Sequence, residues 1–150
     1  MLTGQKIAQL RTEANLTQEQ LAEKLYITRE LVSKWENGKR NPDYKMILKI
    51  AEIFHVKTED IFNYNNSMLS ELSDFIPDKY NENSAELTTV LNAFLATINI
   101  RDRSIFIRRY YFFEDVPVIA EEYKIKESNV RTILMRTRQK LKKYFKGMQL

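Results

Sequence analysis

The chain has 150 residues, a formal net charge of +4, one histidine and no cysteine. Without cysteine, neither a disulfide framework nor a cysteine-based metal site is possible, and a single histidine leaves little support for a zinc finger or a Ser-His nucleophile. No apolar run approaches the roughly 20 residues that span a bilayer, and the N-terminus lacks a signal-peptide pattern, so we expect a cytoplasmic protein with no membrane contact.

The positive charge is concentrated in the last third of the sequence. Residues 1–65 carry a net charge of +1, residues 66–98 carry −4, and residues 99–150 carry +7. A basic segment favours a polyanionic partner, whereas an acidic middle segment is typical of a spacer. The length allows either one domain or two small ones.

The first 62 residues show the hydrophobic periodicity of about five short helices. An early helix over residues 4–14 is expected to bury Ile7, Leu10 and Ala14, which recur at helical spacing. A later helix begins after Pro42. Its expected apolar stripe is Ile47, Ile50, Ala51 and Phe54.

Residues 16–40, LTQEQLAEKLYITRELVSKWENGKR, are predicted to form two short helices joined by a tight turn. Thr17 begins a capping box, TQEQ, and Thr28 is the expected N-cap of the second helix. Val32 and Trp35 then face the core, while the polar residues around them face outward. This arrangement matches a helix-turn-helix whose second helix enters a DNA major groove.

The motif TQEQLAEKL…ITRELVSKWENGKRNPD resembles the phage-repressor (Cro/CI-like, XRE) helix-turn-helix family, over about residues 3–62. The resemblance implies a lambda-repressor-like domain that binds double-stranded DNA, with a structural pair between Arg11 and Glu36. It places Tyr26 where the family usually has glycine, which costs roughly 1 kcal/mol in a left-handed turn. The DNA-binding positions that we expect in this motif are Gln18, Arg29, Glu30, Ser33, Lys34, Lys39 and Arg40.

The side chains at these positions fit the chemistry of DNA recognition. Arg29 has the bidentate donor pattern that reads guanine, and Glu30 accepts hydrogen bonds as cytosine requires. The resemblance implies a phosphate contact for Gln18. We also expect phosphate contacts for Lys39 and Arg40, because they follow the helix. A solvated charged face is the alternative interpretation.

Residues 65–84 are rich in Asn, Ser and acidic residues, and Pro77 interrupts any helix there. A short amphipathic pattern that includes Leu72 and Phe75 favours a linker with one or two helical turns that docks on a neighbour. A disordered tether is the alternative. The expected boundaries are 1–64 for the first domain, 65–84 for the linker and 85–150 for the second domain.

The second domain is predicted to contain another helix-turn-helix. A helix capped by Asn83 and one over about residues 101–113 precede it. Asp115 is the expected N-cap of a short helix that ends near Lys124. A long helix over about residues 127–145 completes the motif.

The stretch RDRSIFIRRYYFFEDVPVIAEEYKIKESNVRTILMRTRQKLKKYF resembles region 4 of bacterial sigma-70-type factors, over about residues 86–146. In those proteins this region reads the −35 promoter element and touches the RNA polymerase flap. Lys124 and Lys126 depart from the glycine and the capping Ser or Thr that the family usually has. Nothing in the sequence resembles sigma region 2, so a self-sufficient sigma factor is not expected. The groove-reading positions that the resemblance implies are Glu127, Ser128, Asn129, Arg131 and Thr132.

The last helix carries charge of one sign. Residues 131–146 contain seven Lys or Arg and no acidic residue, whereas a solvated helix usually mixes signs to gain i, i+4 pairs. The run favours phosphate contact, and it adds Arg136 and Arg138 to the expected DNA-binding residues. The aromatic run over 110–113 is interpreted as core rather than as a base-stacking surface.

The sequence therefore predicts an all-α protein with two helix-turn-helix domains, acting as a sequence-specific DNA-binding transcriptional regulator of bacterial or phage type. The second domain is expected to add a second DNA contact or a contact with RNA polymerase. A homodimer is expected, because repressor-like half-sites are related by two-fold symmetry. No cofactor, metal or enzymatic motif is found in the sequence, so an enzyme is not expected. The alternatives are an interaction protein whose second domain binds RNA polymerase or a regulatory protein, a sigma-like accessory factor, and an antitoxin.

Overall fold

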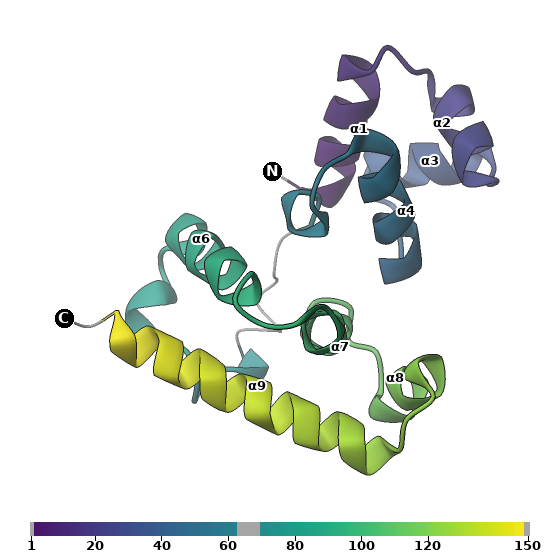
Figure 1. Ribbon diagram of the computed structural model, residues 1–150. Coiled ribbons are helices and arrows are strands. Elements are labelled where there is room, and N and C mark those ends of the chain that lie inside the picture. The colour runs from purple at the N-terminus through teal and green to yellow at the C-terminus, as the bar shows by residue number, and fades with distance from the viewer. Residues whose placement is uncertain (1, 63–69, 149–150) are drawn as a thin grey trace. The chain divides into compact units, whose positions relative to one another are not determined.

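The computed structural model describes residues 2–62 and 70–148, and every regular element within those ranges is a helix (Figure 1). The chain separates into two compact units, Met1–Asn63 and Tyr64–Leu150. The predicted all-α class is confirmed. In the described part of the chain, no helix is both long and apolar enough to cross a membrane.

The first unit packs short helices around one apolar core. Leu21, Trp35 and Ile47 are among its largest buried side chains, and each comes from a different helix. The backbone of α1 approaches that of α3 so closely that position 4 requires glycine, because a Cβ atom there would lie 1.9 Å from the carbonyl oxygen of Trp35. The elements are α1 (Thr3–Glu13), α2 (Gln18–Leu25), α3 (Arg29–Glu36), α4 (Tyr44–Phe54) and the 3-10 helix η1 (Thr58–Asp60).

Three apolar positions in this unit differ from the prediction. Leu10 of α1 is half-buried rather than buried. Ala14 is exposed, because α1 ends at Glu13 and Ala14 leaves the helical face as its C-cap. Phe54 is half-buried rather than buried, because it is the last residue of α4 and the chain turns at His55. The rest of the predicted α4 stripe, Ile47, Ile50 and Ala51, is buried.

Several helices end on a residue that is left-handed without being glycine. Tyr26 ends α2 with φ 57° and ψ 42°, and His55 ends α4 with φ 54° and ψ 41°. Lys124 ends a helix of the second unit with φ 55° and ψ 44°. A side chain in this conformation costs roughly 1–2 kcal/mol. Tyr26 gains little packing in return, because it is 94% exposed.

The second unit is organised along its longest helix, α9, with α6, α7 and α8 arranged beside it (Figure 1). Phe94 of α6 and Phe106 of α7 meet edge to face, with ring centroids 6.3 Å apart. Both rings are almost fully buried, so they anchor these two helices to one core. The elements are η2 (Asp78–Tyr80), α6 (Ser84–Leu95), α7 (Ile100–Tyr110), α8 (Val116–Tyr123) and α9 (Glu127–Gly147).

The expected linker over 65–84 lies partly outside the described residues. Its described part, from Ser70 onward, is packed into the second unit, where Leu72, Ile76 and Tyr80 are buried. The ring of Tyr80 lies 5.1 Å from that of Phe145 on α9. The amphipathic pattern in this segment therefore corresponds to side chains that contribute to the core of the second unit.

Candidate nucleic-acid interface

Side-chain caps fix where the two helices of the first helix-turn-helix begin. Thr17 and Gln20 form the predicted capping box: the Thr17 hydroxyl accepts from the Gln20 N–H at 3.1 Å, and the Gln20 side chain accepts from the Thr17 N–H at 2.8 Å. The Thr28 hydroxyl accepts from the Leu31 N–H at 3.2 Å. Thr28 thereby sets the start of α3, so that Arg29 occupies its first turn.

The helix α3 is held by one buried face and leaves a polar face exposed. Val32 is 0% exposed and Trp35 is 2% exposed. Arg29, Glu30 and Lys34 are exposed on the other side of the same helix. Because the apolar face fixes the rotation of α3, the polar side chains keep a defined outward direction.

A hollow of about 260 Å³ runs along this outward face. Among the predicted residues it brings together Arg29, Glu30, Ser33, Lys34 and Lys39. Gln18 and Arg40 do not line it. Asn37 was missed by the sequence prediction and does line it, and its side chain accepts from the Lys39 N–H at 3.1 Å. Asn37 is also the C-cap of α3, so the same residue ends the helix and holds the following lysine in place.

A polar network ties α1, α2 and α3 together beneath this face. Arg11 Nε donates to Glu36 Oε1 at 2.5 Å, and Arg11 Nη2 donates to Oε2 at 3.1 Å. Arg11 Nη1 also donates to the carbonyl oxygen of Leu16 at 2.8 Å. The ion pair is well shielded, with 15% and 9% of the two side chains exposed, so it contributes more than a surface pair.

Gln18 joins this network through its amide, which donates to Glu36 Oε2 at 2.7 Å. An amide group has two N–H donors, so one donor remains for a second acceptor. Gln18 is also the first residue of α2, where backbone N–H groups favour an anion. The expected phosphate contact of Gln18 is compatible with its bond to Glu36 and stays a prediction.

The second helix-turn-helix is formed by α8 and α9. Lys126 occupies the N-cap of α9 without a side-chain hydrogen bond, so α9 begins without the cap that Thr28 supplies to α3. What holds α9 is its apolar face, which buries Val130, Ile133, Leu134, Thr137, Leu141 and Phe145.

The residues predicted to bind DNA on α9 fall on two flanks of that buried face. A helix turns by about 100° per residue, so Arg131 and Arg136 point roughly 140° apart. Arg131 shares its flank with Arg138, whereas Asn129 and Thr132 lie on the side of Arg136. Glu127 and Ser128 are exposed in the first turn.

The two flanks differ in how their side chains are engaged. Arg138 Nη1 donates to the Tyr110 hydroxyl at 2.6 Å, and its guanidinium lies 5.6 Å from the ring centroid of Phe75. Arg131 pairs with Glu127 at 3.3 Å, one turn away. On the other flank Arg136 is exposed. Thr132 donates its hydroxyl to the carbonyl oxygen of Ser128 at 2.9 Å.

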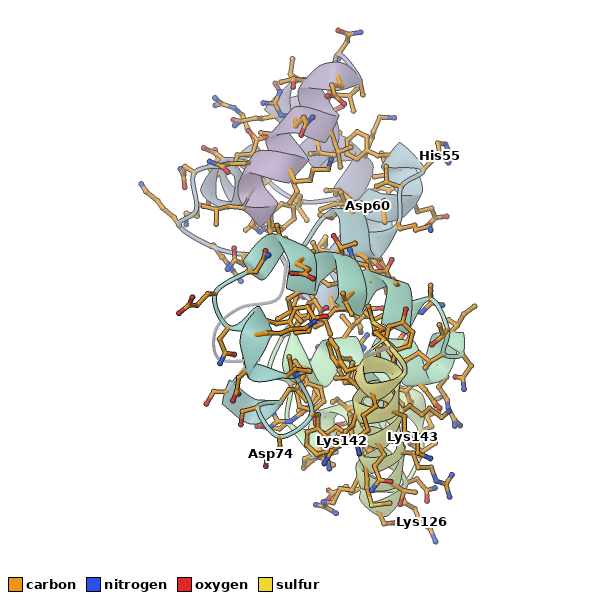
Figure 2. The ribbon with its side chains drawn as sticks, turned by 90° about the vertical axis from the view of Figure 1, so that its left-hand side faces the viewer. His55, Asp60, Asp74, Lys126, Lys142 and Lys143 are labelled. Atoms are coloured by element: carbon orange, nitrogen blue, oxygen red, sulfur yellow. The ribbon has the colours of Figure 1, made fainter. Side chains whose placement is uncertain are left out.

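Lysines extend the basic surface beyond the predicted site residues. Lys126, Lys142 and Lys143 are exposed at the start and in the second half of α9 (Figure 2). The predicted one-signed run over 131–146 includes Lys142 and Lys143, although only its arginines are among the predicted DNA-binding residues, and Lys126 lies outside it. Such a surface attracts phosphates along the length of the helix.

Arg108 supports the second motif from inside. It is 5% exposed, and its Nη1 donates to both carboxylate oxygens of Glu114, at 3.0 and 3.1 Å. Burial lowers the pKa of Arg108, but its hydrogen bond to Glu114, the charge of Glu114 and the neighbouring Tyr123 outweigh this, so the net pKa is raised. Arg108 therefore stays charged and fixes the loop between α7 and α8.

No group of three or more His, Asp or Glu side chains that could hold a metal ion is found in the residues that the structure describes. The arrangement that does exist is two helix-turn-helix motifs, each with one buried face and one polar face on its second helix. In the first motif this geometry fits contact with a DNA groove.

A model of the helix-turn-helix family matches residues 7–61. An HTH-type transcriptional regulator of Archaeoglobus fulgidus is 41% identical over 66 residues, which are 44% of this chain and 93% of that protein. The chain belongs to the helix-turn-helix family. The family model ends at residue 61, before α6 begins, so the resemblance of the second unit to sigma region 4 stays a prediction.

Two further relatives of this helix-turn-helix protein are longer than the matched region. The HTH-type transcriptional activator BcrR of Enterococcus faecalis is 46% identical over 60 residues, which are 40% of this chain but only 29% of BcrR. The HTH-type transcriptional regulator ImmR of Bacillus subtilis is 29% identical over 87 residues, 58% of this chain and 68% of ImmR. No solved structure matches the chain.

Proposed function

We propose that the protein is a sequence-specific DNA-binding transcriptional regulator. The observation that carries this proposal is α3, which is fixed by Val32 and Trp35 and presents a hollow of about 260 Å³ lined by charged and polar side chains. A short helix with this construction fits a major groove, which is about 12 Å wide. The names of relatives that are HTH-type transcriptional regulators support the same function.

Within this proposal the residues of the first motif have different roles. Arg29 and Lys34 read base edges, with Glu30 and Ser33 beside them. Lys39, Arg40 and the start of α2 at Gln18 hold phosphates and thereby set the position of α3 on the duplex. The roles differ in their dependence on sequence, which makes them separable by experiment.

The second motif adds a second contact. Arg136 and the lysines of α9 supply a positive flank for DNA phosphates, and tethering to the first domain raises the local concentration of that flank. Linked binding of this kind raises affinity by roughly 10²–10⁴ when the tether spans both sites. A homodimer supplies the second half-site, as repressor-like helix-turn-helix proteins require.

A second candidate function rests on the engagement of Arg138 and Arg131 by neighbouring side chains. In this alternative the second unit binds RNA polymerase or a regulatory protein instead of DNA. Arg136→Glu in the full chain separates the two. Loss of DNA affinity and a shallower salt dependence support the second DNA contact. Unchanged DNA affinity with loss of polymerase in a pull-down supports the interaction protein.

The proposal is tested by selection of duplexes from a random pool, with the full chain at low salt. We expect enrichment of one sequence whose two halves are related by two-fold symmetry. Light scattering on the complex is expected to give two copies of the chain per duplex. Recovery of no common sequence, with retention of all duplexes at equal affinity, would contradict sequence-specific binding.

A further inference from the structure

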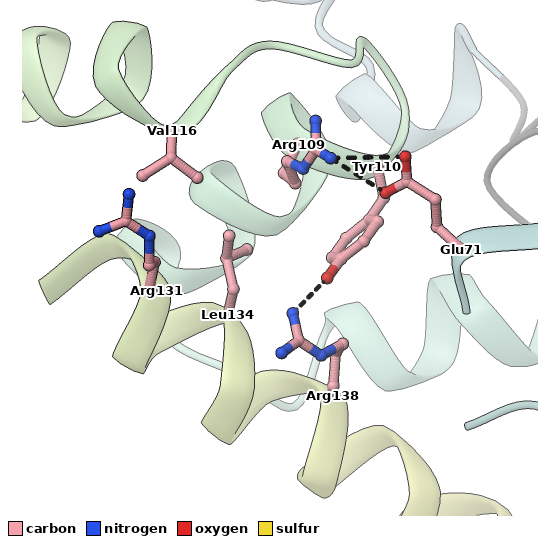
Figure 3. Close-up of a pocket in the computed structure, with 7 residues that line it drawn as sticks. All are labelled: Glu71, Arg109, Tyr110, Val116, Arg131, Leu134 and Arg138. Carbon is pink, nitrogen blue, oxygen red and sulfur yellow. Dashed lines mark hydrogen bonds and ion pairs between the residues drawn. The ribbon is translucent and has the colours of Figure 1, made fainter. Parts of the chain in front are cut away.

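A second hollow, of about 390 Å³, lies within the second unit beside α7, α8 and α9 (Figure 3). Its volume falls in the range of sites that hold small molecules. The wall combines charged and apolar side chains: Glu71, Arg109, Tyr110, Val116, Arg131, Leu134 and Arg138. Three guanidinium groups against one carboxylate give this hollow a formal charge of +2.

The three guanidinium groups keep hydrogen-bonding capacity for another anion. Arg109 Nη2 contacts the Glu71 carboxylate at 3.3 and 3.4 Å, which is longer than the 2.7–2.9 Å typical of strong charge-assisted bonds. Arg131 is 63% exposed, and its ion pair with Glu127, one turn away on the same helix, is a weak surface interaction. Arg138 uses Nη1 for the Tyr110 hydroxyl, and a guanidinium has five donors.

Glu71 occupies the position that an external anion would take on Arg109. Its side chain is 38% exposed, and it comes from the acidic segment that precedes α6. In Figure 3 Glu71 and Arg131 stand on opposite sides of the wall, with Tyr110 and Leu134 between them. A ligand with more negative charge than a carboxylate therefore competes with Glu71 for Arg109 and gains Arg131 in addition.

We propose that this hollow binds a phosphate group. Arg109, Arg131 and Arg138 hold the phosphate oxygens, because planar guanidinium groups match phosphate geometry and carry a permanent charge. Val116 and Leu134 contact the rest of the ligand. The phosphate group could belong to a small phosphorylated molecule or to the backbone of DNA. Phosphate binding by this hollow does not depend on the proposed function, so it is tested first without DNA.

The test uses the full chain with pyrophosphate as the probe, at fixed ionic strength, followed by titration calorimetry and by NMR of the arginine Nε–H groups. We expect saturable binding with shifts at Arg109, Arg131 and Arg138. Arg109→Gln is expected to weaken binding about tenfold, because a charged hydrogen-bond donor is lost. The matched control is Lys146→Gln, which removes an exposed cation of α9 about 12 Å beyond Arg138 along that helix and leaves binding within about twofold.

Glu71→Gln gives a result of opposite sign. It removes the internal competitor while keeping its size, so pyrophosphate is expected to bind about threefold more tightly. This variant decides the question even if Arg109→Gln does not fold, as judged by circular dichroism. Absence of saturable pyrophosphate binding, equal weakening by Arg109→Gln and Lys146→Gln, or weaker binding by Glu71→Gln would each overturn the proposal.

A second arm identifies the source of the phosphate group. Duplex DNA is titrated into the chain with and without saturating pyrophosphate. Competition that disappears in Arg109→Gln assigns the hollow to the DNA backbone as well, and unchanged DNA affinity assigns it to a small phosphorylated molecule. Both results presuppose the binding measured in the first arm, and failure of DNA binding alone would affect only the proposed function.

Discussion

The second helix of each helix-turn-helix motif is held in place by different interactions. In the first, Thr17 and Thr28 cap both helices, and a shielded network around Glu36 ties three helices together. In the second, Lys126 provides no side-chain cap, and the longer α9 is held by a long apolar face. The comparison teaches that a short recognition helix needs its ends fixed, whereas a long one is positioned by packing.

The largest expected effect comes from the core beneath the first recognition helix. Trp35→Ala removes a fully buried aromatic side chain, so it should destabilise the first unit by about 3–5 kcal/mol. Thermal unfolding followed by far-UV circular dichroism is expected to show loss of this unit while the helices of the second unit melt as before. Phe106→Ala, which removes a buried aromatic side chain from the second unit, should leave the first unit folded. A single transition lowered equally by both changes would contradict the division into two units.

The second largest expected loss of stability comes from breaking the shielded network around Glu36 in the first motif. Glu36→Ala leaves Arg11 partly buried without its carboxylate and also removes the acceptor of Gln18. We expect a loss of about 2–3 kcal/mol, measured by urea denaturation of the full chain. Glu59→Ala serves as the control, because it makes the same change at a carboxylate of η1 that lies outside this network. Equal effects from the two changes would show that the network adds nothing.

Variants at the two N-caps are expected to change stability in opposite directions. Thr28→Ala should cost about 1 kcal/mol, because the Leu31 N–H loses its acceptor. Lys126→Thr supplies the cap that α9 lacks, and it should stabilise the second unit by about 0.5–1 kcal/mol. Chemical denaturation of the two variants measures both. If Lys126→Thr has no effect on stability, the start of α9 is fixed by packing alone.

The smallest expected effect is at the turns of both motifs. Tyr26→Gly and Lys124→Gly remove a side chain from a left-handed residue, so each should stabilise its unit by about 0.5–1 kcal/mol after the greater freedom of glycine in the unfolded chain is included. Gly38→Ala, at φ 79°, provides the converse and should destabilise. Melting temperatures of the three variants check the signs. Destabilisation by Tyr26→Gly would reveal a role for this exposed ring in the folded state.

The local features of the fold could be predicted because they depend on short-range patterns. The capping box at Thr17, the cap at Thr28 and the burial of Val32 and Trp35 all follow from spacing within one or two turns. Ala14 was misplaced because one residue beyond a helix end loses the helical direction. Helix ends are fixed by small differences in backbone hydrogen bonding, which periodicity does not resolve.

Contacts between distant segments could not be predicted in the same way. The contact of Glu71 with Arg109 joins residues 38 positions apart, and the hydrogen bond of Arg138 to Tyr110 joins residues 28 apart. Sequence spacing assigned Arg138 to DNA because it shares a helix with other basic residues. Only the packing of α7 against α9 shows that its guanidinium is engaged by a neighbour and faces a hollow.

The central claim, that the outward face of α3 reads DNA, is tested most directly by comparing Arg29→Ala with Lys39→Ala in the full chain. Fluorescence anisotropy is measured on the selected duplex and on duplexes with single base changes. We predict that Arg29→Ala loses roughly 1–3 kcal/mol of discrimination at one base position, whereas Lys39→Ala weakens binding to all duplexes equally and lowers the salt slope by about one. Unchanged discrimination in Arg29→Ala, with full affinity retained, would contradict the account.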